Sequence, residues 1–208
     1  MSLSPDAAEL SSAALGIGVP VTDGQAASLA AFETLLSERA VDLGLVAKGD
    51  RHRIRERHLL DCLRAASAVV ETDREGYDLG SGAGLPGVVV AIARPGLRVV
   101  LLEARARRVA FLELAVAELR LSNIAVRHVR IEEAEGPADL CFARALAPLE
   151  ESWKAARRLL RPGGRLVYFA GARAEAQGTD TPLVGASACL VLEPVLESFG
   201  RLVIMTRQ

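Results

Sequence analysis

The sequence predicts an α/β fold: a doubly wound, mostly parallel sheet that ends in an antiparallel hairpin and carries a helical cap. Three observations predict it. From Tyr77 onward, short apolar runs alternate with stretches of helical periodicity, which is the pattern of successive βαβ units. Two late apolar runs, 189–196 and 201–206, are separated by so short a link that they must pair antiparallel. Before Tyr77 the periodicity is helical.

The first 70 residues are expected to form the helical cap. Thr22 and Gln25 have the spacing of a capping box, and apolar residues recur at helical spacing after them. A second helix is expected from about Arg51 to Val70. No linker rich in Gly, Ser or Pro follows it. We therefore expect a cap of residues 1–70 packed on a main domain of residues 71–208 in one compact unit.

Five strands and three helices are expected in the alternating part of the main domain. The strands are 77–79, 99–102, 124–129, 139–142 and 166–169, and the helices are 86–93, 105–119 and 149–160. The hairpin is expected to turn at Phe199 and Gly200, and the small, polar stretch 171–187 to be a mobile loop. A parallel sheet with such a hairpin is the usual layout of the Rossmann-like class I methyltransferase fold.

Composition narrows the class of protein. No apolar run approaches the roughly 20 residues that span a bilayer, so no membrane partner is expected. The first 16 residues lack the basic start of a secretory signal. Three scattered cysteines without a CxxC pair predict neither a disulfide framework nor a metal site. A cytoplasmic protein without a metal is the expectation.

Arginines gather in short stretches, although the net charge is only −1. Residues 1–44 are predominantly acidic, and residues 48–58 reverse that sign. Such clusters can hold phosphates, or they can be ordinary solvated helix faces. The candidates for phosphate contact are Arg51, Arg53, Arg55, Arg57, Arg105, Arg107 and Arg108.

The chemistry is expected at the glycine-rich turn Asp78-Leu-Gly-Ser-Gly-Ala-Gly-Leu-Pro-Gly87. A predicted strand leads into this turn, and ligands of such sheets bind where strands end at their carboxyl edge. Glycine lets the backbone approach a ligand closely and adopt positive φ, which makes Gly80, Gly82 and Gly84 candidate cofactor contacts. Glu103 closes the next strand, where a carboxylate can accept both ribose hydroxyls; the alternative is an exposed residue that opens a helix.

Two cofactors compete for this turn. Gly82, Gly84 and Gly87 match the dinucleotide fingerprint GxGxxG, and Glu103 follows at a suitable separation, which favours NAD. Against NAD, Asp78 lies directly before the first glycine, a position that methyltransferases use to approach the methionine part of their cofactor. Gly80 also begins GxGxG at the strand end, and no second, dehydrogenase-like domain follows. S-adenosylmethionine is therefore expected, with an NAD-binding module as the alternative.

The turn with its Leu-Pro-Gly end resembles the glucose-inhibited division protein B family, the bacterial small-subunit ribosomal RNA guanine-N7 methyltransferases. Similar segments follow in order from about Phe32 to Gly164. They include Arg57-His-Leu-Leu-Asp-Cys62, Arg107-Arg108, Leu121-Ser-Asn-Ile124, Arg130-Ile-Glu-Glu133 and Ala143-Arg-Ala145. The chain departs from many members at Asp42-Leu43-Gly44, where they carry Asn-Leu-Thr, and at Ala170-Gly171, where they carry Lys-Gly.

The resemblance implies roles for further residues. Gly80 and Leu85 would contact the cofactor, and Ile131 and Glu132 would hold its adenosine part. Arg144 would face both the cofactor and the methyl-transfer centre. His58 and Asp61 are one helical turn apart, and we expect them to bond to each other as a structural pair.

The implied reaction is methylation of N7 of a guanine in 16S ribosomal RNA, with ribosomal RNA or the small subunit as partner and the chain acting as a monomer. Guanine N7 carries a lone pair and no proton, so the reaction needs alignment rather than a general base. The segment Phe142-Ala143-Arg144-Ala145 lacks the Asn/Asp-Pro-Pro-aromatic motif typical of exocyclic-amine methylation. A methyltransferase of the same fold that acts on a small molecule is the remaining alternative.

Overall fold

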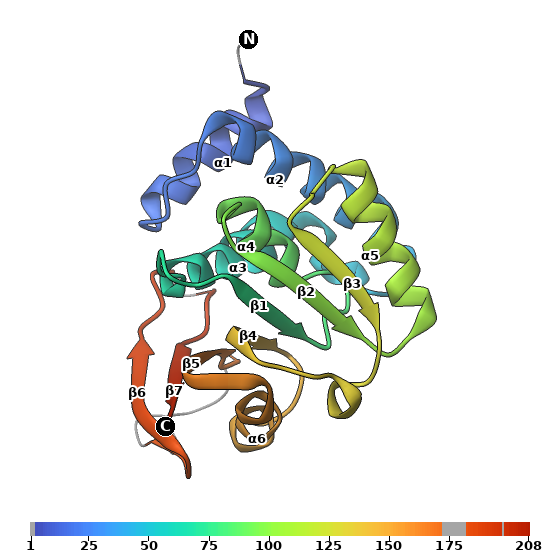
Figure 1. Ribbon diagram of the computed structural model, residues 1–208. Helices are drawn as coiled ribbons and strands as arrows, with labels where there is room; N and C mark the ends of the chain where they lie inside the picture. Colours follow the sequence, from blue (N-terminus) through green and yellow to red (C-terminus); the bar gives the residue numbers. More distant parts are fainter. Residues whose placement is uncertain (1–2, 172–181, 197) are drawn as a thin grey trace.

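The computed structural model describes residues 3–171, 182–196 and 198–208, and within them seven strands form one sheet of order β3-β2-β1-β4-β5-β7-β6 (Figure 1). The strands are β1 (Glu75–Leu79), β2 (Arg98–Glu103), β3 (Ile124–His128), β4 (Ala138–Arg144), β5 (Leu160–Phe169), β6 (Ala186–Leu192) and β7 (Leu202–Arg207). The first five strands pair parallel, and β7 runs antiparallel to both of its neighbours. The expected fold class is confirmed.

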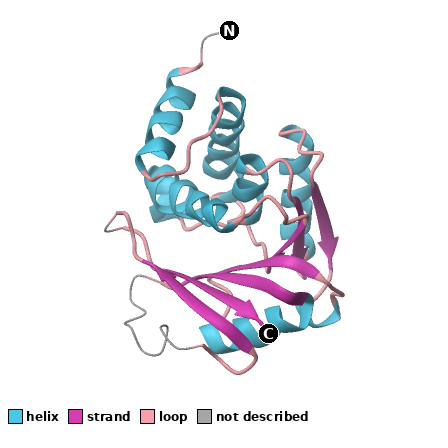
Figure 2. Cartoon of the chain, turned by 60° about the vertical axis from the view of Figure 1, so that its left-hand side comes forward, coloured by secondary structure: helices cyan, strands magenta, loops and turns pink. Residues whose placement is uncertain are grey.

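Helices cover both faces of the sheet (Figure 2). α4 (Gly87–Ala93) and α5 (Ala106–Glu118) pack on one face together with the N-terminal helices, and α6 (Leu149–Leu159) packs on the other. Residues 99–102 of β2 are fully buried, as are nearly all of β4. Covering on both faces explains why the central strands read as continuous apolar runs rather than as an alternating pattern.

The N-terminal helix α2 (Asp23–Leu35) contacts α4 through the polar side chain of Gln25 and through apolar packing. α1 (Pro5–Gly16) precedes α2, and the predicted capping box of α2 is present, because Thr22 and Gln25 exchange hydrogen bonds of 2.8 and 3.3 Å. The amide nitrogen of Gln25 also donates to the carbonyls of Ile92 and Ala93, each at 3.0 Å. These carbonyls belong to the last turn of α4, where carbonyl oxygens find no N–H partner within the helix itself. Phe32 of α2 and the apolar residues of α4 share one hydrophobic cluster.

The helix expected from Arg51 to Val70 is instead a chain of short, irregular helical turns. They are the 3-10 helix η2 (Lys48–Arg53), the π-helix η3 (Ile54–Leu60), α3 (Asp61–Leu63) and the 3-10 helix η4 (Arg64–Ala68). A π-turn is wider than an α-turn and is frequent at functional sites. Here the segment brings His58 and Asp61 to the end of β4, where both contact Arg144.

The C-terminal hairpin differs from the expectation in its connection. β6 ends at Leu192 and β7 begins at Leu202, so residues 193–201 join them and no tight turn is present at Phe199 and Gly200. Pro194 lies two positions after the end of β6 and cannot donate to a strand ladder, so the strand cannot continue through it. Of the predicted loop 171–187, residues 172–181 lie outside the described residues, and residues 186–187 belong to β6. β5 begins earlier than predicted, at Leu160, which pairs with Ala138 beside an irregularity.

In the described part of the chain, no helix has both the length and the apolar character needed to cross a membrane.

Candidate active site

Three adjoining cavities follow the carboxyl edge of the sheet around β1, where the strand order changes direction. The β2 cavity, of about 410 Å³, lies between the ends of β2, β3 and β4. The loop cavity, of about 180 Å³, lies over the glycine turn, and the β5 cavity, of about 370 Å³, lies beyond it at the ends of β4 and β5. The first two share Gly80, Arg108 and Ala145, and the last two share His58, Arg144 and Ala145. They therefore form one continuous cleft.

The glycine turn uses its glycines in two different ways. Gly80, Gly82 and Gly84 all have positive φ, of 69°, 57° and 84°. Gly80 and Gly82 line the cavities, and a Cβ on Gly80 would lie 2.9 Å from the side chain of Leu146. A Cβ on Gly84 would instead lie 2.6 Å from Val88, inside the core. Gly84 therefore packs against the core, whereas Gly80 and Gly82 line the cleft, with Leu85 beside them on the wall of the loop cavity. The expected contacts of these residues with the cofactor stay predictions.

Asp78 stabilises the glycine turn from its buried side. Its side chain is buried, and Oδ2 accepts the backbone N–H of Gly87 at 3.1 Å. Burial raises the pKa of Asp78 to about 7, and hydrogen bonds from Gly87 and Ser81 only partly offset this effect. Asp78 lines none of the three cavities. The side chain points toward α4, where it ties the start of the helix to the end of the strand. Its expected contact with the cofactor stays a prediction.

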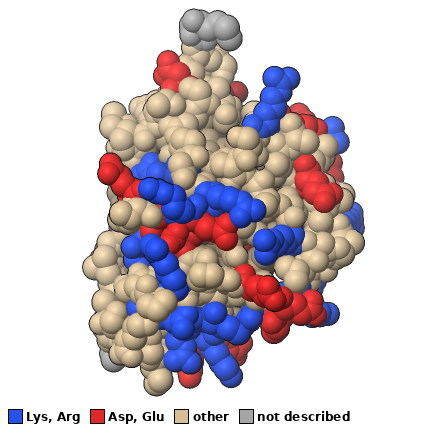
Figure 3. Space-filling model, viewed as in Figure 1, with Lys and Arg blue, Asp and Glu red and all other residues tan. Residues whose placement is uncertain are grey.

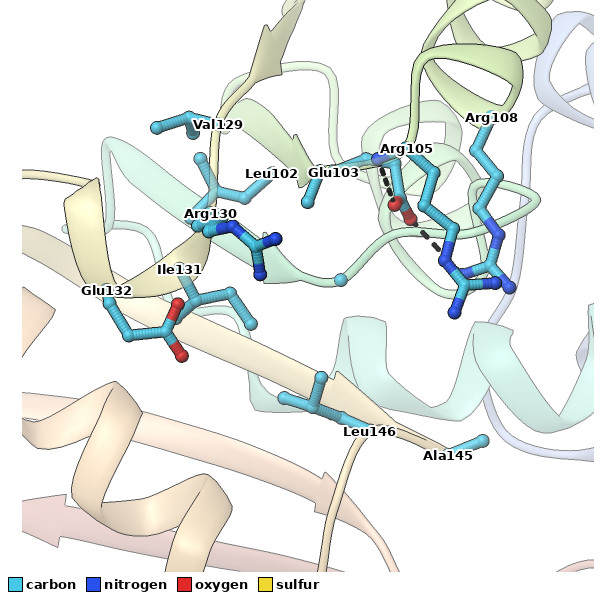
Figure 4. Close-up of a pocket in the computed structure, with 12 residues that line it drawn as sticks. Leu102, Glu103, Arg105, Arg108, Val129, Arg130, Ile131, Glu132, Ala145 and Leu146 are labelled. Carbon is cyan, nitrogen blue, oxygen red and sulfur yellow. Dashed lines mark hydrogen bonds and ion pairs between the residues drawn. The ribbon is translucent and has the colours of Figure 1, made fainter.

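Glu103 is the carboxylate that faces the cleft (Figure 4). It is only 4% exposed, so it is not the exposed residue of the alternative interpretation. Oε2 accepts the N–H of Gly82 at 3.0 Å, and Oε1 accepts the N–H of Arg105 at 2.9 Å. The guanidinium of Arg108 lies 3.5 Å from Oε2. Since each carboxylate oxygen has two lone pairs, Oε1 keeps capacity for one further hydrogen bond after its backbone partner. The second position of Oε2 is taken by the long contact from Arg108, which a ligand would have to displace.

The far wall of the β2 cavity comes from the segment after β3. Ile131 and Glu132 lie in the 3-10 helix η5 (Ile131–Glu133), and both line the cavity. Their expected role in holding the adenosine part of the cofactor stays a prediction. Figure 4 shows them with Arg130 across the cavity from Arg105 and Arg108. Arg130 was missed by sequence reasoning, although it directly precedes the two candidates. Leu146, also missed, closes the cavity opposite Glu103.

Arg144 ends β4 and lies where the loop and β5 cavities meet. Its NH2 group lies 3.0 Å from Nδ1 of His58 and donates to the carbonyl of Arg57 at 3.2 Å. Its Nε lies 3.6 Å from Asp61, whose other oxygen pairs with Arg64 at 2.6 Å. His58 and Asp61 therefore do not form the expected direct pair. Each contacts Arg144, which comes from a strand more than 80 positions later.

Ala145 is the residue that all three cavities share, and its backbone is left-handed, with φ of 51°. This conformation costs a non-glycine residue about 1–3 kcal/mol and persists only where the surroundings enforce it. Such residues cluster at functional sites. No sequence signal marks this position, because alanine carries no turn preference of its own.

The predominantly acidic N-terminal segment pairs with the arginines that follow it. Arg51 lies 2.5 Å from Asp42, and Arg55 lies 2.9 Å from Glu33 and 2.5 Å from Glu9. Arg57 lies 3.0 Å from Asp50. Figure 3 shows basic and acidic side chains interspersed on one face of the molecule rather than a basic stripe.

The remaining candidate arginines differ from Arg51, Arg55 and Arg57 in their ion pairs. The side chains of three arginines are exposed and form no ion pair with a carboxylate within the described ranges: Arg53, Arg105 and Arg107. Arg108 lines the cleft beside Glu103. The arginines of residues 51–57 therefore do not act as one free basic row.

The comparisons with known proteins agree with this geometry. The family model described as "GidB: rRNA small subunit methyltransferase G" matches residues 25–186, from α2 to the start of β6. The chain is 43% identical over 138 residues to ribosomal RNA small subunit methyltransferase G of Acidothermus cellulolyticus, which covers 66% of this chain and 62% of that protein. It is 34% identical over 180 residues to the protein of the same name from Leptothrix cholodnii, covering 84% and 83%. Against the first of these relatives, the chain spans less than two thirds of the relative's length.

A solved structure supports the fold alone. A methyltransferase from Geobacter sulfurreducens superimposes with a TM-score of 0.59 at 16% sequence identity, over 86% of this chain and 87% of that one. The family match includes the glycine turn, Glu103, the segment after β3 and Arg144, which together line the cleft. The expected family is thereby confirmed: the chain belongs to the GidB family of rRNA small subunit methyltransferase G proteins.

Proposed function

We propose that this protein is an S-adenosylmethionine-dependent methyltransferase that methylates N7 of a guanine in 16S ribosomal RNA. One observation carries the proposal: a continuous cleft has a buried carboxylate, Glu103, at one end and a held guanidinium, Arg144, at the other. The family membership supports the same reaction.

The β2 and loop cavities suit the cofactor. Oε1 of Glu103 retains capacity for one hydrogen bond, and Oε2 would offer a second once a ligand displaces the long contact from Arg108, so that the carboxylate could accept the two hydroxyls of a ribose. Ile131 offers an apolar surface for the adenine, with Glu132 beside it. Gly80 and Gly82 carry no side chain, so the backbone of the turn is open to the methionine part of the cofactor in the loop cavity. Arg144 borders this second cavity and would face the sulfonium.

The dinucleotide alternative loses its main support. In that fingerprint the second glycine lets the backbone approach the pyrophosphate. Here the second glycine of the match is Gly84, and the space at its Cα is filled by Val88, Leu112 and Phe32. The second glycine of the GxGxxG match therefore packs the turn against α2 and α5.

The β5 cavity suits the target base. S-adenosylmethionine supplies the electrophilic methyl group, and guanine N7 attacks it with its own lone pair, so no side chain has to take a proton. Arg144 must leave N7 free and can reach O6 on the same edge of the base. Asp61 carries a negative charge beside Arg144. This charge reduces the repulsion between the guanidinium and the positive charge that develops on the base as it is methylated.

The RNA backbone would be held mainly by arginines without a carboxylate partner. Arg53, Arg105 and Arg107 meet this condition, whereas Arg51, Arg55 and Arg57 would first have to leave their ion pairs. The partner in this proposal is the small ribosomal subunit or its RNA, met in the cytoplasm by a monomer. The cap of residues 1–70 contributes His58 and Asp61 to the domain of residues 71–208.

The test uses the full chain with radiolabelled S-adenosylmethionine. Purified small subunits and deproteinised 16S RNA are incubated separately, and the labelled base is identified by mass spectrometry. Label at guanine N7 in either substrate supports the proposal. Calorimetry with S-adenosylhomocysteine and with NADH runs in parallel. Binding of NADH alone, or cofactor binding with no label in either RNA, would contradict the proposal, and the second result would favour a small-molecule substrate.

A further inference from the structure

The contact between Arg144 and His58 fixes the state of the histidine. A guanidinium can only donate hydrogen bonds, so Nδ1 of His58, 3.0 Å away, must accept. The imidazole is therefore neutral, and its proton is on Nε2. His58 itself is only 9% exposed, and it borders both the loop cavity and the β5 cavity.

We propose that His58 is the positioning residue for Arg144: its neutral imidazole, with Nδ1 as acceptor, fixes the direction of the guanidinium at the junction of the two cavities. The inference rests on the proposed function, because the direction matters only if Arg144 faces the reacting base. Asp61 and the carbonyl of Arg57 also hold Arg144, at 3.6 and 3.2 Å. Without the Nδ1 acceptor, Arg144 would stay in the cleft but would lose one of the three contacts that orient its guanidinium.

The surroundings of His58 keep it neutral. Burial lowers the pKa of His58, and the charges of Arg144 and Arg57 lower it further. Asp50 acts in the opposite direction, with Oδ2 at 3.3 Å from Nε2. That contact lacks hydrogen-bond alignment, and the other oxygen of Asp50 is held by Arg57 at 3.0 Å.

The other charged groups near the ring do not reverse this balance. Arg108 lines the loop cavity with His58, and Asp61 reaches the ring only through Arg144. Protonation of Nδ1 would remove the acceptor and place a second positive charge against Arg144.

A pH dependence follows. The neutral form persists below the ordinary value of 6.5, because the pKa is lowered. Turnover is therefore expected to be constant above pH 6.5 and to fall as the pH drops through the lowered pKa of His58. Affinity for S-adenosylhomocysteine is expected to change much less over this range, because Glu103, the proposed ribose acceptor, lies in the β2 cavity, which His58 does not line.

Two amide variants separate the two ring nitrogens. In His58→Asn the side-chain oxygen can occupy the place of Nδ1 and accept from Arg144. In His58→Gln the amide lies near the place of Nε2 and leaves Arg144 without this acceptor. The expected result is a fall in kcat of about 10- to 100-fold for the Gln variant, the size expected for a lost hydrogen bond to a charged group. The Asn variant should recover most of the turnover and lack the acid limb, and exposed His52→Asn is the matched control.

Equal kcat for the Asn and Gln variants, or an unchanged acid limb in the Asn variant, would overturn the proposal. Should either variant fail to fold, nitrogen NMR of the labelled histidines in the unaltered protein still decides, because it reports the tautomer directly. A proton on Nε2 and an accepting Nδ1 support the proposal, and the opposite tautomer refutes it. This measurement needs no substrate, so its outcome is distinguishable from a failure of the proposed methylation.

Discussion

Replacement of Glu103 by Gln tests the cofactor site most directly. The carboxylate oxygens accept one backbone N–H each, from Gly82 and Arg105. This leaves one acceptor position on Oε1 for a ribose hydroxyl, and a second hydroxyl would take the position on Oε2 that Arg108 holds at 3.5 Å. An amide nitrogen cannot accept. Whichever oxygen it replaces, one backbone N–H loses its partner and one ribose hydroxyl loses its acceptor.

The magnitude follows from these contacts. A hydrogen bond to a charged group contributes about 1.5–3 kcal/mol, so loss of one ribose contact should weaken cofactor binding about 10- to 150-fold. The backbone N–H left unpaired costs the fold about 1–3 kcal/mol, which lowers the Tm of a chain of this size by about 2–12 °C. Both effects should appear together, since the same carboxylate serves the turn and the sugar.

The assay is calorimetric titration with S-adenosylhomocysteine, made well below the Tm of the variant, with thermal unfolding recorded on the same samples. Glu113→Gln is the control, because it makes the same chemical change on an exposed part of α5 outside the cavities. A Glu103→Gln protein whose Kd stays within about twofold of the unaltered chain would refute the assignment of this carboxylate to the ribose.

Three further substitutions probe the glycine turn, its support and the far end of the cleft. Gly82→Val should abolish binding of S-adenosylhomocysteine in calorimetry, because a β-branched residue is strained at φ of 57° and would cover the turn. Its Cβ would make only an ordinary contact of 3.8 Å with the carbonyl oxygen of Gly80, so the Tm should fall by less than about 10 °C. Retained affinity would count against the pocket. Asp78→Asn should remove the contribution of Asp78 to the pH dependence of stability. The pKa of Asp78 is about 7 in the folded state and 3.8 ordinarily, so the unaltered protein loses up to about 4 kcal/mol of unfolding free energy as the pH rises from 4 to 8. The stability of the variant relative to the unaltered chain, from urea unfolding at pH 5 and pH 8, should therefore rise with pH, and a constant difference would show that Asp78 is not buried as a proton-binding group. Arg144→Ala should lower kcat more than tenfold and leave the Kd for S-adenosylhomocysteine within about threefold, and unchanged turnover would remove Arg144 from the reaction.

Local patterns in the sequence were enough for the framework of the fold. The buried strands, the capping box of Thr22 and Gln25, and the glycine turn after β1 are each determined by neighbours a few positions apart. The place of Glu103 at the carboxyl end of β2 also follows from the strand pattern, since parallel strands present their ends at one edge. For this reason the cofactor end of the cleft could be anticipated.

Only the tertiary structure decided which side chains meet. Asp78 and Gly84 lie in the predicted turn, yet both face the core, because the path of the turn sets their directions. The contacts of Arg144 with His58 and Asp61 join the end of β4 to an irregular helix far away in the chain. The pairing of Arg55 with Glu9 and Glu33 likewise links separate helices. Periodicity reports which face of an element is buried, whereas contacts across such sequence separations depend on how the elements pack, and a single sequence carries no local signal for that.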